Sequence, residues 1–210
     1  MTTDLMGETQ LICPPVQEHL TTQVVIVGSG AAGMRTALDL ADAGVPTLLV
    51  TRGELTDSAT DWAQGGLAAV WRADDSVDLH VADTLTAGAG LCDEQAVRTL
   101  VTRAPGALRR LMADGASFDT DDAGDIDLHL EGGHHARRIL HAGGDQSGHE
   151  VEVTLARRAG ALDVCDHARL IDICTDCRGA TCGVLVARGG TTVEISCDHV
   201  VLATGGIGQL

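Results

Sequence analysis

The sequence predicts an α/β protein with three layers in a β-β-α arrangement: a parallel β-sheet, a layer of helices and an antiparallel meander. Three observations predict this fold class. An apolar run, a glycine-rich turn and a helical pattern follow one another in residues 23–44. A second apolar run follows at residues 46–51, and from residue 164 the pattern changes to short strands separated by turns. A β–α–β start favours a parallel sheet, whereas closely spaced short strands favour an antiparallel meander.

The first strand is expected at residues 23–27 (QVVIV), because this run is apolar and rich in β-branched side chains. A helical pattern follows the glycine-rich turn and ends at Gly44, and residues 46–51 (PTLLVT) are expected to form the second strand. Residues 1–22 are expected to be a flexible N-terminal tail. The predicted organisation is therefore a tail followed by one domain over residues 23–210.

The middle of the chain is expected to alternate helices with loops. Its expected helices are residues 76–87, 93–113 and 148–160, and the loop-like or irregular segments are 53–72 and 114–136. Pro105 is expected to split the second helix, because proline removes a backbone donor and clashes with the preceding turn. The segments LIDIC, CGVLVA and TTVEIS are expected to form the meander over about residues 168–196, and residues 200–203 return to the parallel sheet.

Composition and charge exclude several classes of function. The 210 residues include 14 basic and 30 acidic side chains, and the resulting formal net charge of −16 repels the phosphates of nucleic acids. No apolar run reaches the length of a membrane span, and the N-terminal residues lack the basic and apolar regions of a signal peptide. The 7 cysteines are an odd number, typical of free thiols in a reducing compartment. We therefore expect a cytoplasmic protein with no nucleic-acid or membrane partner.

The glycine-rich turn carries the first chemical signal. Gly28, Gly30 and Gly33 form a G-x-G-x-x-G pattern directly after the first strand and directly before the helix. In a Rossmann-type unit, these glycines allow a tight turn, a close approach to a pyrophosphate and close packing of helix on strand. The helix N-terminus then offers free N–H groups and a positive dipole end to the phosphates. The pattern in this context predicts dinucleotide binding.

The end of the second strand departs from the usual dinucleotide pattern. An acidic residue commonly stands there and binds a ribose hydroxyl, but this chain has Thr51 and Arg52. Thr51 can still exchange a hydrogen bond with a ribose, and Arg52 can pair with phosphate or stack on adenine. This departure argues against an ordinary NAD dehydrogenase.

Four further motifs carry a resemblance to a known family: SATDWAQGGLAAV, DSVDLHVADTLTAGAGLCDEQAV, EGGHHARRILHAGGD and VVLATGGIGQL. With them the chain resembles the L-aspartate oxidases, flavoproteins of the succinate dehydrogenase/fumarate reductase superfamily, over residues 23–210. The resemblance implies FAD as cofactor. It also implies an FAD-binding domain that is incomplete here, because family members continue into a capping domain and a C-terminal helical domain. Their catalytic arginine lies in that continuation, so we expect these 210 residues alone to be inactive.

The resemblance implies a set of cofactor-binding positions. They are Gly28, Ser29, Gly30, Ala31, Ala32, Gly33, Arg52, Ala59, Thr60, Asp61, Trp62, Ala63, Gln64, Gly65 and Gly66. Ala59 stands where the succinate dehydrogenase branch has the histidine that bonds to flavin, so FAD is expected to be held non-covalently. Gly65 and Gly66 can bring backbone N–H groups close to a flat ring, where such donors stabilise negative charge. Trp62 is expected either to contact the flavin or to fill the core.

The reaction that the resemblance implies is oxidation of L-aspartate to iminoaspartate, with hydride transfer to FAD and reoxidation by oxygen or fumarate. The product of that family feeds quinolinate formation and NAD biosynthesis, which implies a functional link to quinolinate synthase. Two alternatives stay open. One is a flavoprotein subunit of the succinate dehydrogenase/fumarate reductase type, and the other is a non-catalytic dinucleotide-binding fragment.

Residues 131–145 are rich in histidine, arginine and glycine, and they raise the question of a metal or an anion site. The histidines lack the H-x-x-x-H and H-E-x-x-H spacings of zinc sites, so no metal is expected. Glu131 matches the family's substrate-orienting glutamate, and we expect it to attract the ammonium group of the substrate. The substrate-side candidates beside it are His134, Arg138 and His141, each with a structural hydrogen bond as the alternative. For His135 and Arg137 the structural role is favoured.

Overall fold

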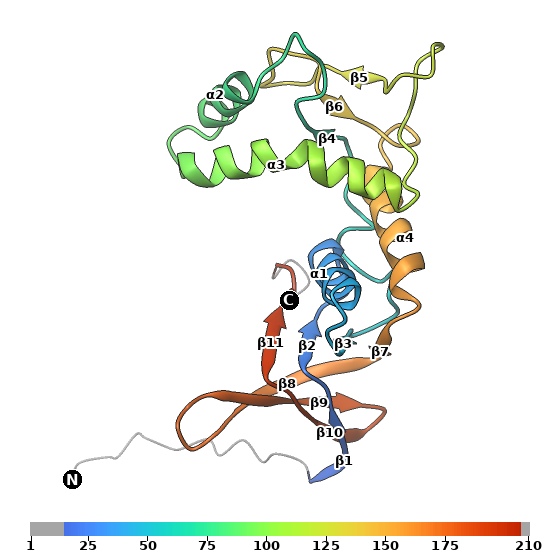
Figure 1. Cartoon of the computed structure of the whole chain (residues 1–210), viewed down its shortest axis with the longest axis vertical. Helices are drawn as coiled ribbons and strands as arrows, with labels where there is room; N and C mark the ends of the chain where they lie inside the picture. Colours follow the sequence, from blue (N-terminus) through green and yellow to red (C-terminus); the bar gives the residue numbers. More distant parts are fainter. Residues whose placement is uncertain (1–14, 207–210) are drawn as a thin grey trace, which may run out of the picture.

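The parallel sheet at the centre of the fold is confirmed by the computed structural model, which describes residues 15–206. Its strands lie in the order β11 (His199–Leu202), β2 (Val24–Val27), β3 (Thr47–Val50) and β7 (Asp163–Cys165), and every neighbouring pair is parallel. The helix α1 (Ala31–Asp42) joins β2 to β3. Figure 1 shows the sheet between the helices and a second sheet. The carboxyl ends of β2 and β3 meet the start of α1 at one edge of the sheet, where ligands bind in such folds.

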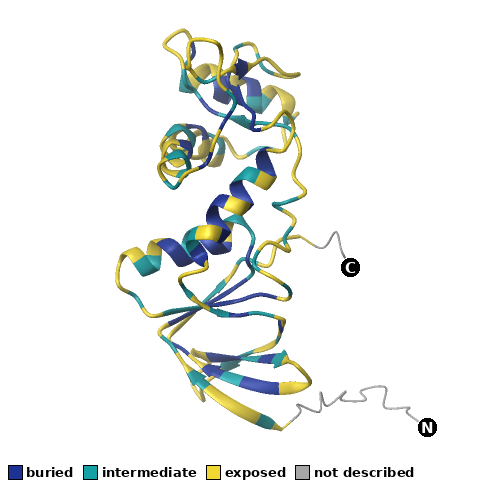
Figure 2. Ribbon diagram, turned by 90° about the vertical axis from the view of Figure 1, so that its right-hand side faces the viewer, coloured by how far each residue is buried: buried dark blue, intermediate teal, exposed yellow. Residues whose placement is uncertain are grey.

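Side chains of β2 alternate between the two hydrophobic cores that hold the layers together. Val24 and Ile26 pack with Met34 and Leu155 beneath the helices α1 and α4 (Ser147–Ala159). Val25 and Val27 point to the opposite face and pack against the second sheet. Successive strand residues face opposite sides of a sheet, so a strand buried on both faces is apolar throughout. Figure 2 shows this burial as dark blue segments along the strands and along α4.

The second sheet contains the predicted meander and one strand that was not predicted. β8 (Ala168–Thr175), β9 (Thr181–Arg188) and β10 (Thr191–Ser196) are antiparallel, as expected. β1 (Val16–Thr21) adds to the edge of β10 in the parallel direction. The tail prediction is therefore wrong for residues 16–21, while residues 1–14 lie outside the described part. The strand depends on backbone pairing with a distant segment, which a local apolar pattern does not reveal.

The helix α3 (Glu94–Ala113) runs without a break through Pro105, so the prediction that proline splits it is wrong. An interior proline costs about 3 kcal/mol through its lost hydrogen bond and its clash. Val101 and Leu108 lie one turn to either side of Pro105 on the inner face of the helix and are buried. Burial of each such side chain contributes about 1.5–3 kcal/mol, which offsets the cost.

A small third sheet lies with α3 and with α2 (Val77–Ala87) at the end of the molecule away from the second sheet (Figure 1). Its order is β4 (Leu67–Ala68), β6 (Ile139–Leu140) and β5 (Leu128–His129). The segments holding β4 and β5 were expected to be irregular, and each of these strands has only two residues. Among the described helices, none combines the length and apolar character that crossing a membrane requires.

Candidate functional site

The β2–turn–α1 unit needs glycine at two positions, one in the turn and one in the first turn of α1. Gly28 has a φ of +114°, and a Cβ atom there would lie 2.2 Å from the carbonyl oxygen of Ala203 in the strand-end segment beside it. A Cβ atom at Gly33 would lie 1.8 Å from the carbonyl oxygen of Gly28. Both distances are far below van der Waals contact, so neither position can carry a side chain. The backbone segments therefore pack closely against each other. Such a turn fits the pyrophosphate of a dinucleotide.

The N-terminus of α1 has no capping side chain of its own. Gly30 is the N-cap and makes no side-chain capping hydrogen bond. The N–H of Ala31 donates to Thr60 Oγ1 at 3.0 Å, which ties the segment 58–66 to the start of the helix. The first turn of a helix otherwise leaves N–H groups and a positive dipole end for an anion. Two of the predicted cofactor segments therefore meet at one helix end.

Ser29 and Thr51 are used inside the protein rather than on its surface. Their hydroxyl oxygens lie 2.8 Å apart, and both residues are buried. The N–H of Thr51 also donates to the carbonyl oxygen of Cys165. The hydroxyl pair joins the carboxyl ends of β2 and β3, and the bond to Cys165 joins β3 to β7, so Thr51 supports the glycine turn from inside the protein. Arg52 follows directly and is exposed at the same edge.

The segment 58–66 rests on the first turn of α4. The N–H of Gly148 donates to the carbonyl oxygen of Ala63 at 3.1 Å. A Cβ atom at Gly148 would lie 2.3 Å from the carbonyl oxygen of Thr60 and 2.4 Å from that of Ala63. The side chains of Asp61 and His149 add a contact of 2.7 Å between Oδ1 and Nδ1. The segment 58–66 is thus held by α4 on one side, and its other side faces outward.

Trp62 is 76% exposed, so it does not fill the core. Its contact with a flavin stays a prediction. Gly65 has a φ of +83°, and a Cβ atom at Gly66 would lie 2.2 Å from Ile139 Cγ2 and 2.9 Å from His141 Nε2. Gly66 therefore brings the cofactor segment directly against β6 and the histidine that follows it. The structure places the AQGG motif beside residues 131–145.

Glu131 and His141 form a hydrogen-bonded pair. His141 Nδ1 lies 2.6 Å from the carbonyl oxygen of Gly144, and His141 Nε2 lies 2.8 Å from Glu131 Oε1. A carbonyl oxygen only accepts hydrogen bonds, so Nδ1 donates to Gly144. The His141 ring is nearly buried, whereas the Glu131 side chain is 45% exposed. The ring of His141 thereby joins the Glu131 carboxylate to the loop at Gly144.

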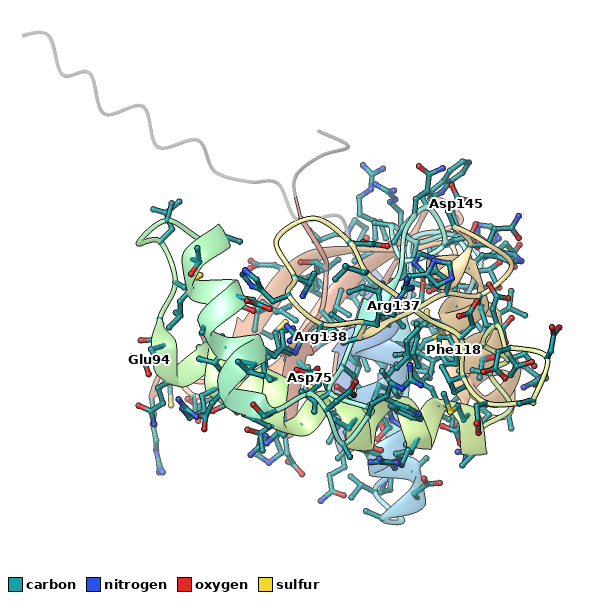
Figure 3. All side chains as sticks on the ribbon, turned by 90° about the horizontal axis from the view of Figure 1, so that it is seen from above. Asp75, Glu94, Phe118, Arg137, Arg138 and Asp145 are labelled. Carbon is teal, nitrogen blue, oxygen red and sulfur yellow. The ribbon has the colours of Figure 1, made fainter. Side chains whose placement is uncertain are left out.

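Arg138 makes structural hydrogen bonds inside the protein and does not lie in a substrate-side position. Its guanidinium is fully buried and donates from Nε and Nη2 to Asp75 at 2.8 and 2.7 Å, and from Nη1 to Asp83 at 2.7 Å. Figure 3 shows Arg138 directed toward Asp75, with Arg137 on the other side of the chain. Burial raises the pKa of Asp83, but hydrogen bonds from His135 and Arg138 outweigh it and hold that pKa well below its usual range. The cation and both anions are compensated within the protein.

The other side chains of this stretch surround the same cluster. The backbone N–H of His135 donates to Asp83, and its ring Nδ1 contacts the same carboxylate. Arg137 donates to the carbonyl oxygen of Leu128 at 3.3 Å, and the structural role favoured for both residues stays a prediction. His134 Nδ1 lies 3.3 Å from Arg138 Nη1, on the edge of the cluster. Of the substrate-side candidates, His141 contacts the Glu131 carboxylate, and the backbone N–H of His134 donates to the Glu131 carbonyl oxygen at 3.2 Å.

The candidate group of metal ligands in the described part of the chain does not include the histidines of residues 131–145. Within residues 15–206, the group of potential ligands whose atoms lie within 4.8 Å of one another is Glu54, Asp166 and His167. This group is mostly exposed and lies outside residues 131–145. It contains none of the predicted site residues.

Three acidic residues of the site were missed from the sequence. Asp75 lies just before α2, Asp83 lies within α2, and Glu152 lies on α4. The sequence pattern predicted these helices but not the burial of the three carboxyl groups. All three are buried. The available signal was a charged residue at a position where the helical period places an apolar one, as for Asp83 beside Val81 and for Glu152 between Val151 and Leu155.

The comparison with protein families identifies the ligand that this geometry is suited to bind. A family model described as an FAD binding domain matches residues 23–210, the whole segment that contains the turn, the loop and the Glu131 stretch. The chain belongs to the FAD-binding domain family. FAD is therefore the dinucleotide for which the FAD-binding domain provides the glycine turn and the helix N-terminus.

Curated relatives of this FAD-binding domain are named L-aspartate oxidase. The one from Streptomyces coelicolor is 48% identical over 198 residues, which are 91% of this chain and 34% of the relative. The one from Mesorhizobium japonicum is 42% identical over 196 residues, which are 91% of this chain and 38% of the relative. The FAD-binding domain described here thus spans about a third of the length of these relatives.

Solved structures similar to this FAD-binding domain come from the succinate dehydrogenase and fumarate reductase flavoproteins. Mycobacterium smegmatis Sdh1 in complex with UQ1 has a TM-score of 0.84 at 28% identity, covering 91% of this chain and 35% of that one. An E. coli quinol fumarate reductase variant has a TM-score of 0.84 at 29% identity, covering 91% and 34%. These similarities agree with the parallel sheet, the helices and the meander described above.

Proposed function

We propose that this chain is the N-terminal FAD-binding part of an L-aspartate oxidase, which oxidises L-aspartate to iminoaspartate and transfers a hydride to FAD. The observation that carries the proposal is the Glu131–His141 pair against Gly66 of the cofactor segment. The pair places a carboxylate beside the segment expected to hold the flavin. The names of relatives at 42–48% identity support the same substrate.

The chain's own residues would hold FAD without a covalent bond. The glycine turn and the first turn of α1 would bind the pyrophosphate, and Arg52 would lie on the adenosine side. The flavin end would lie along residues 59–66, where Gly65 and Gly66 would bring backbone N–H groups close to the ring. Ala59 offers no nucleophile to the flavin. Bound FAD supplies the acceptor for the hydride from the substrate.

Glu131 would orient the substrate through its ammonium group. A carboxylate attracts an ammonium and repels the carboxylates of a substrate without an amine, so it separates aspartate from succinate. His141 holds one oxygen of Glu131 at 2.8 Å and thereby limits the side chain's rotation. Orientation of the α-carbon toward the hydride acceptor is the main contribution that such a contact makes. Arg138 does not bind the substrate in this proposal, because its guanidinium already donates hydrogen bonds to Asp75 and Asp83.

The electron acceptor in the second half of the reaction would be oxygen or fumarate. Fumarate is supported by the similarity to quinol fumarate reductase. Iminoaspartate is an unstable imine, so an enzyme that consumes it, such as quinolinate synthase, is a fitting functional partner in NAD biosynthesis.

A second candidate is a flavoprotein of the succinate dehydrogenase or fumarate reductase type, which the solved structures favour at 28–29% identity. The two candidates differ in the substrate that is oxidised. The test is to assay the complete protein that carries this chain, loaded with FAD, with L-aspartate and with succinate. We expect flavin reduction by aspartate under anaerobic conditions and little reduction by succinate. Reduction by succinate alone would overturn the proposal in favour of the second candidate.

A further inference from the structure

Glu152 is a buried acidic residue that neither the glycine turn nor the Glu131 pair uses. It lies on α4, one turn after Gly148, and its side chain is fully buried. Neither of its carboxyl oxygens has a hydrogen bond of ordinary geometry within residues 15–206. A buried carboxylate without partners is costly, so such a group is usually neutral or has a function.

The position of Glu152 connects it to the pyrophosphate turn. Its side chain faces Ser58, Thr60 and Asp61 closely enough for these groups to affect its ionisation. Thr60 Oγ1 accepts the N–H of Ala31, and the N–H of Thr60 donates to Ser58 Oγ at 3.0 Å. Glu152 therefore lies near the Ser58 and Thr60 hydroxyls, and the Thr60 hydroxyl holds the start of α1.

The same two hydroxyls lie close to the turn at Gly30. A Cβ atom at Gly30 would lie 3.3 Å from Thr60 Oγ1 and 3.8 Å from Ser58 Oγ. The chain of contacts therefore runs from Glu152 through Ser58 and Thr60 to the backbone that faces the phosphates. A charge at Glu152 acts on the phosphates across low-dielectric protein, where it is poorly screened.

Burial raises the pKa of Glu152 to about 7, and the nearby Asp61 adds to this, while the Ser58 and Thr60 hydroxyls oppose it. The carboxyl group therefore changes its charge near neutral pH. Among the charged groups on the elements around it, Asp61 is the one that acts on Glu152, and it is paired with His149. Arg35 of α1 is paired with Asp39 and Asp114.

We propose that Glu152 is a positioning residue that makes FAD binding depend on a proton: the neutral carboxyl supports the pyrophosphate turn, and the carboxylate opposes it. A carboxylate behind the turn repels the negative phosphates, so bound FAD favours protonation of Glu152. By linkage, FAD binding then takes up a proton whenever Glu152 is ionised in the free protein. The inference rests on FAD binding and not on the identity of the oxidised substrate.

The test is the affinity of the apo form of the complete protein for FAD, measured by flavin fluorescence from about pH 6 to about pH 8.5. The Kd of the wild-type protein is expected to rise with pH above about 7, by up to about tenfold per pH unit for a single proton. Glu152→Gln keeps the size and removes the charge. It is expected to bind FAD with the low-pH affinity of the wild type across the whole range.

Two matched variants on α4 separate this effect from its neighbours. His149→Gln removes the imidazole that contacts Asp61, and Glu150→Gln neutralises a carboxylate that accepts the N–H of Ser117. Both are expected to keep the pH dependence of FAD binding. If either variant loses it while Glu152→Gln keeps it, the assignment to Glu152 is wrong.

Calorimetry in buffers of different ionisation enthalpy gives a second readout. Near pH 8, the wild-type protein is expected to take up a proton on binding FAD, about one at most, and Glu152→Gln none. If Glu152→Gln does not fold, Glu152→Leu provides a neutral side chain that suits a buried position. Equal proton uptake by the wild type and a folded Glu152 variant would overturn the inference, as would a wild-type Kd that does not change with pH.

Discussion

At the scale of single residues, the Glu131–His141 pair makes the most specific prediction about the reaction. Glu131→Gln removes the charge and keeps the size, so an ammonium group loses a charge-assisted contact. We expect kcat/KM for aspartate in the complete protein to fall about tenfold or more, corresponding to about 1–3 kcal/mol. Fumarate reduction should fall much less, because fumarate has no ammonium to lose. FAD affinity should stay near that of the wild type.

The control for Glu131 is the comparison of the two substrates within one variant. Steady-state kinetics with aspartate and with fumarate on the same preparation exclude differences in folding or flavin content. Equal losses on both would show that Glu131 only anchors its loop to His141. The contact would then be structural and the substrate assignment would fail.

Arg138 and Arg137 are adjacent in sequence but should respond very differently to substitution. Arg138→Met leaves the buried carboxylates of Asp75 and Asp83 without their cation, a change that typically costs about 3–5 kcal/mol. Arg137 is exposed and makes one long hydrogen bond to Leu128 O, so Arg137→Met should cost less than about 1 kcal/mol. Chemical denaturation of both variants checks this. Similar losses of unfolding free energy would contradict the buried ion cluster.

At the scale of elements, the β2–turn–α1 unit depends on the absence of a side chain at Gly33. Gly33→Ala places a Cβ atom 1.8 Å from Gly28 O, so the helix must move away from the strand. We expect loss of FAD binding together with a lower melting temperature. The measurements are FAD titration and thermal unfolding of the same variant.

Gly106 supplies the matched control for Gly33, because it lies inside α3 and a Cβ atom there meets nothing within 4 Å. Gly106→Ala should raise the unfolding free energy by about 0.5–1 kcal/mol through helix propensity and leave FAD binding unchanged. If Gly33→Ala bound FAD as well as Gly106→Ala does, the close packing of the turn would not matter for the cofactor.

The elements also show how far a local pattern can predict a fold. The strand–turn–helix unit and the meander were predictable because their apolar periods and turn residues are local. α3 was predicted with a break because the penalty of Pro105 is local, whereas the burial of Val101 and Leu108 that offsets it is tertiary. In the candidate site, Glu131 and the glycines came from motifs. Glu152 and the pairing of Arg138 with Asp75 depend on contacts between segments far apart in sequence, which no pattern contains.

At the scale of the whole molecule, the absence of a histidine at position 59 predicts how the cofactor is held. Ala59 has no atom that can bond to the flavin, so FAD should leave the complete protein when its fold is lost. Acid precipitation is expected to release the yellow colour into the supernatant, where absorbance spectroscopy measures it. Colour retained by the washed precipitate would contradict non-covalent binding.

The pairing of β1 with β10 has a consequence for synthesis of the chain. Residues of β1 leave the ribosome long before their partners, because His19 pairs with Glu194 and Leu20 with Ile195, near the other end of the described chain. The central strand β2 likewise pairs with β11, which is translated much later. Neither sheet can therefore close until nearly the whole domain has been translated, and pairing over such sequence distances is slow. The nascent domain exposes open strand edges throughout this interval, so it depends on protection by chaperones more than a domain built from local hairpins does.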